Sequence, residues 1–220
     1  LIIPDYMQGA AVLDATAGRN VMYELFPPAN VEPIPKDSRN YQNVTLHISR
    51  DHNLGSGYMK DKAKELSQEL IDELNERLDE SRKVFVCTHK DIEPALDLCK
   101  PLFDLRKGHW GAIDGSNDYR DCDTAVIFGI PYRPNILSTN IYMALQGEQT
   151  TDWLQDSTNR AHGEHQDIKK SLTNGQIITS IIQAINRVRC RKVIDAEGNC
   201  LSTDVYLMLP KNAIAEEILD

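Results

Sequence analysis

The sequence lacks three features that would assign it to a familiar class at once. No apolar run approaches the ~18 residues needed to cross a membrane, and no signal peptide is visible. The five cysteines contain no Cys-x-x-Cys pair, and their odd number favours free thiols in a reducing compartment. We therefore expect a cytoplasmic protein, or a nuclear one if the source is eukaryotic.

An excess of positive charge is also missing. The 24 Lys and Arg residues are outnumbered by 33 Asp and Glu, which gives a formal charge of −9. This balance excludes a protein that coats nucleic acid with its whole surface, although a groove acts through its own local charges. Apolar and charged fractions of 41% and 26% are those of an ordinary globular protein, and 220 residues can bury a sizeable core.

The chain has no nucleotide-phosphate loop of the form Gly-x-x-x-x-Gly-Lys-[Ser/Thr], and residues 55–60 have the wrong spacing for one. No Asp-Glu pair ends an apolar strand, where it would hold Mg²⁺. His162 and His165 have no third ligand at a suitable spacing, so we expect no metal site. This chain alone is therefore expected not to hydrolyse ATP.

Short apolar stretches alternate with amphipathic ones along most of the chain. Strands are expected at 10–17, 44–48, 84–88, near 110–113, and at 124–128, 192–194 and 204–209. Helices are expected at 18–26, 58–80, 92–98, 136–146, 168–172, 176–189 and from 212. We expect a break in the helical pattern at Asn174-Gly175 and a hairpin across Asp195–Asn199. Buried strands that alternate with helices predict a parallel α/β sheet covered on both faces.

The most unusual stretch is basic. Residues 183–192 hold three arginines and a lysine, and no acid occurs from Gln176 to Ile194. An apolar helix leads into this cluster. Cations at the end of a helix either complement its dipole or bind an anion such as phosphate.

Three loops follow expected strands, at the positions where parallel sheets bind ligands. They are Thr88-His89-Lys90, residues 115–119 and residues 129–133. The Thr88 hydroxyl and the Lys90 charge suit a phosphate, and Gly115 allows close backbone approach. The alternatives are a helix-capping turn for the first loop and an ordinary turn for the second.

The order of these pieces resembles that of the motifs of superfamily-2 helicases. Residues 13–17 are similar to motif III, residues 84–88 to motif IV, residues 115–131 to motif V, and residues 183–191 to motif VI. The resemblance covers residues of about 10 to 210. It implies the second, C-terminal RecA-like domain, which has three layers and a mainly parallel sheet flanked by helices. We expect residues 1–42 to be a lead-in and linker, and residues 43–220 to be this domain.

Motif VI usually reads Gln-x-x-Gly-Arg-x-x-Arg. In this chain Asn186 replaces its glycine and Cys190 its second arginine, so Arg189 or Arg191 must supply that charge. The resemblance implies that Arg187 is the arginine finger, one helical turn after Gln183.

The resemblance also implies the roles of the other loop residues. Nucleotide contacts fall to Gly115, Asn117 and Asp118, and nucleic-acid contacts to Thr88, His89, Lys90, Ser116 and Arg133. The implied cofactors are ATP and Mg²⁺, held mainly by a first RecA-like domain of the same polypeptide. The implied partner is single-stranded nucleic acid, DNA in preference to RNA, and no membrane is involved. Because the chain opens without methionine and ends in an unfinished helical pattern, we expect a segment of a longer polypeptide.

Two other interpretations remain open. One is a degenerate helicase-like module that only binds or scaffolds, and the other is an unrelated α/β enzyme that binds a phosphorylated metabolite. The helicase interpretation predicts Arg187 on the same open face as Thr88 and Asn117. A buried ion pair at Arg187 would oppose it, and a closed, deep pocket would favour the enzyme.

Overall fold

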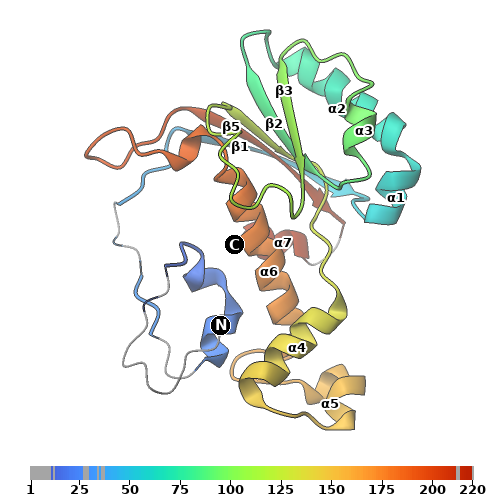
Figure 1. Ribbon diagram of the computed structural model, residues 1–220, viewed down its shortest axis with the longest axis vertical. Coiled ribbons are helices and arrows are strands. Elements are labelled where there is room, and N and C mark those ends of the chain that lie inside the picture. Colours follow the sequence, from blue (N-terminus) through green and yellow to red (C-terminus); the bar gives the residue numbers. More distant parts are fainter. Residues whose placement is uncertain are drawn as a thin grey trace.

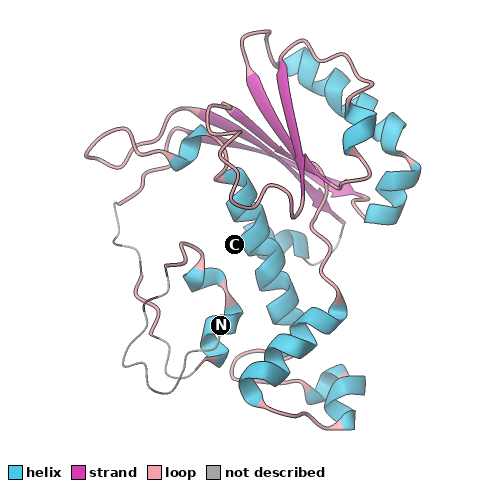
Figure 2. Cartoon of the chain, in the orientation of Figure 1, coloured by secondary structure: helices cyan, strands magenta, loops and turns pink. Residues whose placement is uncertain are grey.

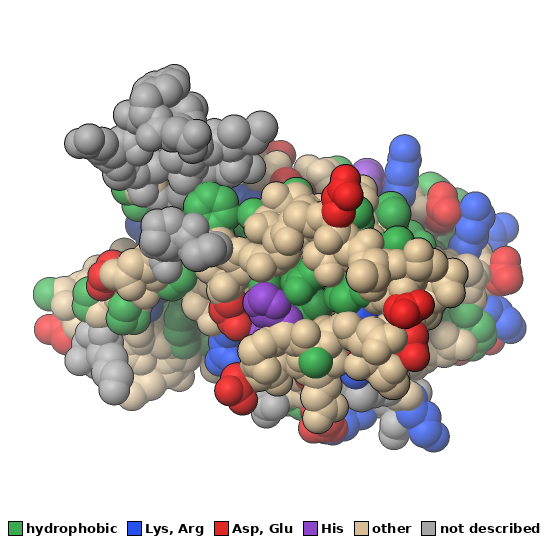
Figure 3. Space-filling model, turned by 90° about the horizontal axis from the view of Figure 1, so that it is seen from below, with side chains coloured by type: hydrophobic (Ala, Val, Ile, Leu, Met, Phe, Trp, Pro, Cys, Tyr) green, Lys and Arg blue, Asp and Glu red, His purple; other side chains and the backbone are tan. Residues whose placement is uncertain are grey.

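The computed structural model describes residues 11, 13–26, 30–33, 35, 38–211 and 214–219 (Figure 2). A twisted sheet with helices on both faces forms the upper part of the molecule, and a smaller group of helices lies below it (Figure 1). Acidic side chains are spread over the face seen from below and do not gather in one patch (Figure 3). No helix among the described residues combines the length and apolarity needed to cross a bilayer.

The sheet has five strands, all parallel, in the order β1-β5-β4-β2-β3. Their bounds are β1 (Val44–His52), β2 (Lys83–Thr88), β3 (Asp104–His109), β4 (Thr124–Ile127) and β5 (Thr203–Pro210). The central strands β2 and β4 are nearly continuous apolar runs, because helices cover them on both faces. The expected α/β class, with a RecA-like three-layer arrangement, is confirmed.

Two layers of helices cover the sheet. The helices α1 (Ser56–Asp61), α2 (Ala63–Arg77) and α3 (Glu93–Leu96) lie on one face, and α6 (Ile168–Ile185) and α7 (Ile214–Leu219) on the other. Alternation along β2 points Val84 and Val86 into the core under α2, and Phe85 and Cys87 into the core under α6. One strand therefore contributes to both cores.

The lower group of helices, here called the helical lobe, packs around the first turns of α6. It comprises η1 (Ala17–Arg19), η2 (Val21–Leu25), α4 (Asn135–Gln146), α5 (Thr151–Gln155) and η3 (Ser157–Asn159). Its small core joins Leu25, Tyr142, Trp153, Ile168 and Leu172, with the Tyr142 and Trp153 rings stacked at 4.8 Å. The helix α6 thus belongs to both parts of the molecule.

Two strand predictions near the ends of loops are wrong. The described residues of 10–17 form no strand, since Leu13 is fully exposed and Asp14 closes a turn by accepting a 2.6 Å hydrogen bond from the Thr16 hydroxyl. The rest of that stretch lies outside the described residues. The strand expected near 110–113 lies earlier in the chain, as β3. Its exposed Asp104 and polar Arg106 interrupt the apolar pattern by which a strand is recognised.

Two further predictions of element boundaries are wrong. Helix α6 runs unbroken through Asn174-Gly175. A Cβ at position 175 would lie 3.3 Å from the Arg19 carbonyl oxygen, so glycine lets η1 pack closely on the helix, and Asn174 donates to Glu217. The hairpin is reduced to a single bridge between Val193 and Cys200. Residues 204–209 pair in parallel with β1 and β4, so they form a strand of the sheet and not the second arm of a hairpin.

Candidate functional site

The basic cluster forms a turn after α6, here called the arginine turn (residues 186–192). Asn186 caps the helix, and η4 (Arg189–Arg191) follows. Val188 and Cys190 are buried in the core under α6, with exposed fractions of 0% and 2%. These two anchors alternate with the arginines, which are only partly buried. Burial raises the pKa of Cys190 to about 11, so its thiol stays protonated and carries no charge.

The three arginines have different partners. Arg189 Nε donates to the Ser202 carbonyl oxygen at 2.6 Å, and Nη1 lies 3.9 Å from Asp123 Oδ2. Arg191 Nη1 donates to Asn117 Oδ1 at 2.9 Å. Arg187 Nη1 donates to the Ser116 carbonyl oxygen at 3.4 Å, while its buried Nε has no acceptor. Within the described part of the chain, Arg187 and Arg191 form no ion pair, whereas Arg189 is held by the fold.

The partner of these arginines is the loop 115–118. Gly115 has φ = 77°, and a Cβ there would meet no atom within 4 Å, so backbone conformation alone favours glycine. Ser116 Oγ donates to Asp118 Oδ2 at 2.8 Å, and the Asp118 carbonyl oxygen accepts from Arg106 at 2.7 Å. The loop is therefore fixed on β3. Exposed Asn117 faces Arg191, and Gln183 is exposed one helical turn before Arg187.

A charge network fixes the strands behind Arg189. Arg82 lies 2.6 Å from both Asp123 and Asp204, and also donates to Thr124 Oγ1 at 2.7 Å. Burial tends to raise the pKa of Asp204, but hydrogen bonds from Arg82 and His47 outweigh burial and lower it. The network ties the amino ends of β4 and β5 together beneath the arginine turn.

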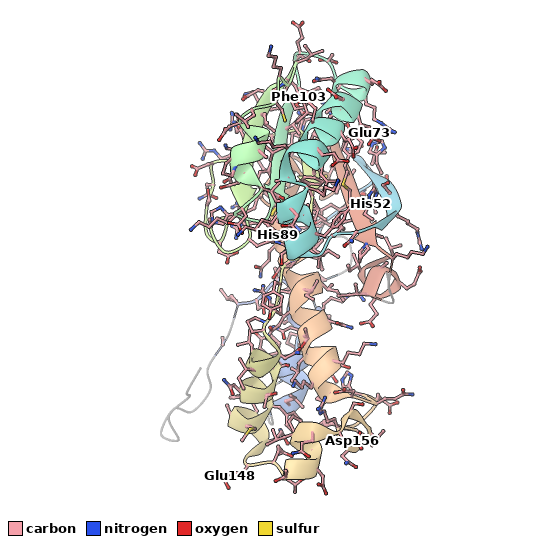
Figure 4. The ribbon with its side chains drawn as sticks, turned by 90° about the vertical axis from the view of Figure 1, so that its right-hand side faces the viewer. His52, Glu73, His89, Phe103, Glu148 and Asp156 are labelled. Atoms are coloured by element: carbon pink, nitrogen blue, oxygen red, sulfur yellow. The ribbon has the colours of Figure 1, made fainter. Side chains whose placement is uncertain are left out.

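The loop 88–90 lies at the opposite edge of the sheet. Figure 4 shows His89, just after β2, at the lower end of the sheet, and Phe103, just before β3, at the upper end. The backbone of Arg189 is bonded to Cys122, which precedes β4, so the arginine turn belongs to the upper, amino edge. Thr88 is fully buried, and its hydroxyl has no partner. Lys90 is exposed.

His89 and Arg133 are held by neighbouring elements of the carboxyl edge. A Cβ at Gly129, where φ is 112°, would lie 2.9 Å from the His89 ring, so both space and conformation require glycine. Burial lowers the pKa of His89, and its Nε2 has no partner. Arg133 Nη2 donates to Ser180 Oγ on α6. The structure thus joins residues 115–118 to Arg187 and Arg191, and leaves residues 88–90 and Arg133 as a separate group. The expectation that Arg187 shares one open face with Thr88 is therefore wrong, because Thr88 is buried at the carboxyl end of β2, whereas the contact with the loop that holds Asn117 is present.

One group beside the arginine turn was missed from the sequence. Tyr41 donates its hydroxyl to Asn186 Oδ1 at 3.5 Å, and Arg39 Nη1 donates to the Tyr41 hydroxyl at 3.1 Å. The segment is held there by the Asn40 N–H, which donates to the Gly198 carbonyl oxygen at 2.8 Å. The sequence predicts an extended linker over residues 30–41, and only the Arg-x-Tyr pattern at its end indicates a further contact.

Two cavities lie away from this site. One of about 330 Å³ is in the helical lobe and is lined by Asn135, Arg160, Asp167, Lys169, Lys170, Thr173 and Asn174. A second of about 130 Å³ lies beside His47 and Tyr206. Neither includes the arginine turn. In the described ranges, no group of three or more His, Cys, Asp or Glu side chains is placed to hold a metal ion.

The fold and this site define an α/β protein with a cationic turn over one edge of a parallel sheet. No protein-family model matches the chain, and no curated protein or solved structure does so either.

Proposed function

We propose that this chain is the C-terminal motor domain of an ATP-dependent nucleic-acid helicase or translocase. It supplies the arginine finger and part of the track for a single strand, and it is inactive as an ATPase without a first RecA-like domain. One observation carries the proposal. The loop that resembles motif V and the turn that resembles motif VI meet across more than 70 residues of sequence, through Arg187–Ser116 and Arg191–Asn117.

The chemistry of phosphoryl transfer explains why this meeting matters. Negative charge on the γ-phosphate must be stabilised as it leaves, and a guanidinium suits this because it is always charged and offers a rigid fork of donors. Arg187 makes one long hydrogen bond and keeps a buried Nε–H without an acceptor. Among the described residues a single acceptor, the Ser116 carbonyl oxygen, meets its Nη groups, which leaves other Nη donors for a phosphate.

The partners of the arginines also indicate which residue supplies the second positive charge expected in motif VI. Cys190 occupies the motif position of the second arginine but is buried. Arg189 is occupied by Ser202 and Asp123, so Arg191 takes this role. ATP and Mg²⁺ supply the phosphoryl group and its charge neutralisation, and both are held mainly by the first domain.

The nucleic-acid track is assigned to the carboxyl edge. Lys90 is exposed, and Tyr132 is 71% exposed beside Arg133. A cation and an aromatic ring are the two groups that single strands use, for the backbone and for base stacking. The proposed partner is a single strand, DNA in preference to RNA, in the cytoplasm or, for a eukaryotic source, in the nucleus.

ATP hydrolysis by the natural polypeptide that contains this chain tests the arginine finger. Arg187→Ala is expected to lower kcat by about 10³-fold or more, and Arg187→Lys to restore little of it. Arg120→Ala is the matched control, because Arg120 is exposed near the same loop and has no side-chain partner within the described residues. A kcat within a few-fold of wild type in Arg187→Ala contradicts the proposal.

Strand binding tests the track separately. Lys90→Ala and Arg133→Ala are each expected to weaken binding of single-stranded DNA and to reduce the salt slope by about 0.7. An unchanged slope removes these residues from the track. Strand binding without any ATP hydrolysis by the natural polypeptide would identify a scaffold module instead.

A further inference from the structure

The segment 39–41 lies directly against the arginine turn. The Tyr41 hydroxyl bridges Arg39 and Asn186, the residue that precedes Arg187. Burial raises the pKa of the Cys190 thiol, and the positive charge of Arg39 is close enough to oppose this rise. The hydrogen-bond chain thus places Arg39 beside the turn.

Positive charge at this place is not neutralised. In the described ranges, no carboxylate pairs with Arg39, Arg187, Arg191 or Lys192. By contrast, Arg189, Arg82 and Arg106 all have carboxylate partners. Arg39 therefore adds a positive charge from a distant segment beside the turn that carries the other three, in a chain whose formal charge is −9. Such a concentration attracts a compact polyanion.

We propose that Arg39 and Tyr41 complete a nucleoside triphosphate site at the arginine turn, with the Tyr41 ring stacking on the base and the Arg39 guanidinium bonding a phosphate. The inference rests on the proposed function and adds to it two residues that lie outside the motifs. Tyr41 is 45% exposed, which leaves room for a ligand, and its hydroxyl bonds both Arg39 and Asn186.

The arrangement favours a nucleotide over a strand. A strand distributes its charges along a line and needs a track, whereas a triphosphate gathers its charges at one place and needs cations that converge. Arg39 contacts the turn through Tyr41 and Arg191 belongs to the turn, and both are held on neutral oxygens, those of Tyr41 and Asn117. A phosphate displaces no carboxylate there, so binding costs no ion pair.

The site also gives Asn186 a role. Glycine at this position would have no side chain to meet Tyr41. Asn186 donates from Nδ2 to the Ile182 carbonyl oxygen at 2.9 Å, which orients its Oδ1 toward the Tyr41 hydroxyl. The departure from motif VI thus positions the ring.

Isothermal titration of the natural polypeptide with ATP, and separately with inorganic tripolyphosphate, tests this site. Tyr41→Ala is expected to weaken ATP binding about 10-fold and to leave tripolyphosphate binding unchanged, because tripolyphosphate has no base. Tyr41→Phe keeps the ring and stays within about 3-fold of wild type. Arg39→Ala weakens both ligands by about 10-fold. Tyr58→Ala, another half-exposed tyrosine, is the matched control.

The outcomes separate the inference from the proposed function. Unchanged ATP affinity in Tyr41→Ala and Arg39→Ala overturns the inference, as does a loss confined to binding of single-stranded DNA. Loss of hydrolysis in Arg187→Ala with no effect at Tyr41 overturns the inference and keeps the arginine finger. Loss of ATP affinity in Tyr41→Ala with full hydrolysis in Arg187→Ala keeps the nucleotide site and overturns the finger.

Discussion

Stability measurements on single arginine substitutions distinguish the arginine that serves the fold from those proposed to bind a ligand. Arg189→Ala removes a 2.6 Å hydrogen bond to Ser202 and a 3.9 Å contact with Asp123, a carboxylate that is only 10% exposed. A hydrogen bond from a charged group contributes about 1.5–3 kcal/mol, and the longer, partly exposed ion pair adds well under 1. We expect a loss of about 2 kcal/mol in the free energy of unfolding, which corresponds to a fall in Tm of about 4–8 °C.

The neighbouring arginines are expected to behave differently. Arg187→Ala loses one long bond and relieves a buried Nε–H without an acceptor, so its unfolding free energy should change by less than about 0.5 kcal/mol. Arg191→Ala loses an exposed bond to Asn117, worth about 0.5–1 kcal/mol. Thermal and urea unfolding of the three variants measure this order. If Arg187→Ala destabilises the chain as much as Arg189→Ala, the assignment of Arg187 to a ligand is refuted.

Three further predictions concern the rest of the sheet. Arg82→Ala removes the 2.6 Å ion pairs of Asp123 and Asp204 and leaves the almost buried Asp123 only the longer contact with Arg189, which should cost about 3 kcal/mol by urea unfolding. The exposed ion pair lost in Arg77→Ala should cost at most about 0.5 kcal/mol, and equal costs would contradict the network. Gly129→Ala combines a positive φ with a ring 2.9 Å away and should lower stability by about 2 kcal/mol, whereas Gly57→Ala, inside α1 with open space, should be neutral or stabilising. Burial lowers the folded-state pKa of His89, and a backbone hydrogen bond with Leu54 and the charge of Asp91 oppose this only in part. The unfolded state therefore binds more protons, and stability is lost as pH falls below about 6.5. His89→Gln should remove this loss between about pH 7 and 5, and an unchanged profile would count against it.

The central elements were predictable because their patterns are local. The strands β2 and β4 are short apolar runs bounded by polar residues, and both were expected within one residue of their observed ends. The apolar face of α6 was also predictable, since the burial of Ile177, Ile181 and Ala184 follows helical spacing. The same pattern predicted that this helix leads into the arginine turn. Parallel pairing followed from the alternation of strands and helices.

The failures share a physical cause, which is dependence on distant contacts. The close packing of α6 at Gly175 involves η1, more than 150 residues earlier in the chain. The contact between Tyr41 and Asn186 spans 145 residues and has no periodic signature. The division of roles between Arg189 and Arg191 depends on which oxygen each guanidinium meets, and residue spacing does not encode this.

The continuity of α6 has a mechanical consequence. Its 18 residues form a rod about 27 Å long, clamped at one end in the core of the helical lobe and at the other in the core beneath the sheet. Because the rod has no break at Asn174-Gly175, its two ends move together. A tilt of only about 5° at the lower clamp displaces the upper end by about 2 Å, which is enough to make or break a hydrogen bond from Arg187. A displacement of the helical lobe is therefore transmitted along α6 to the arginine turn.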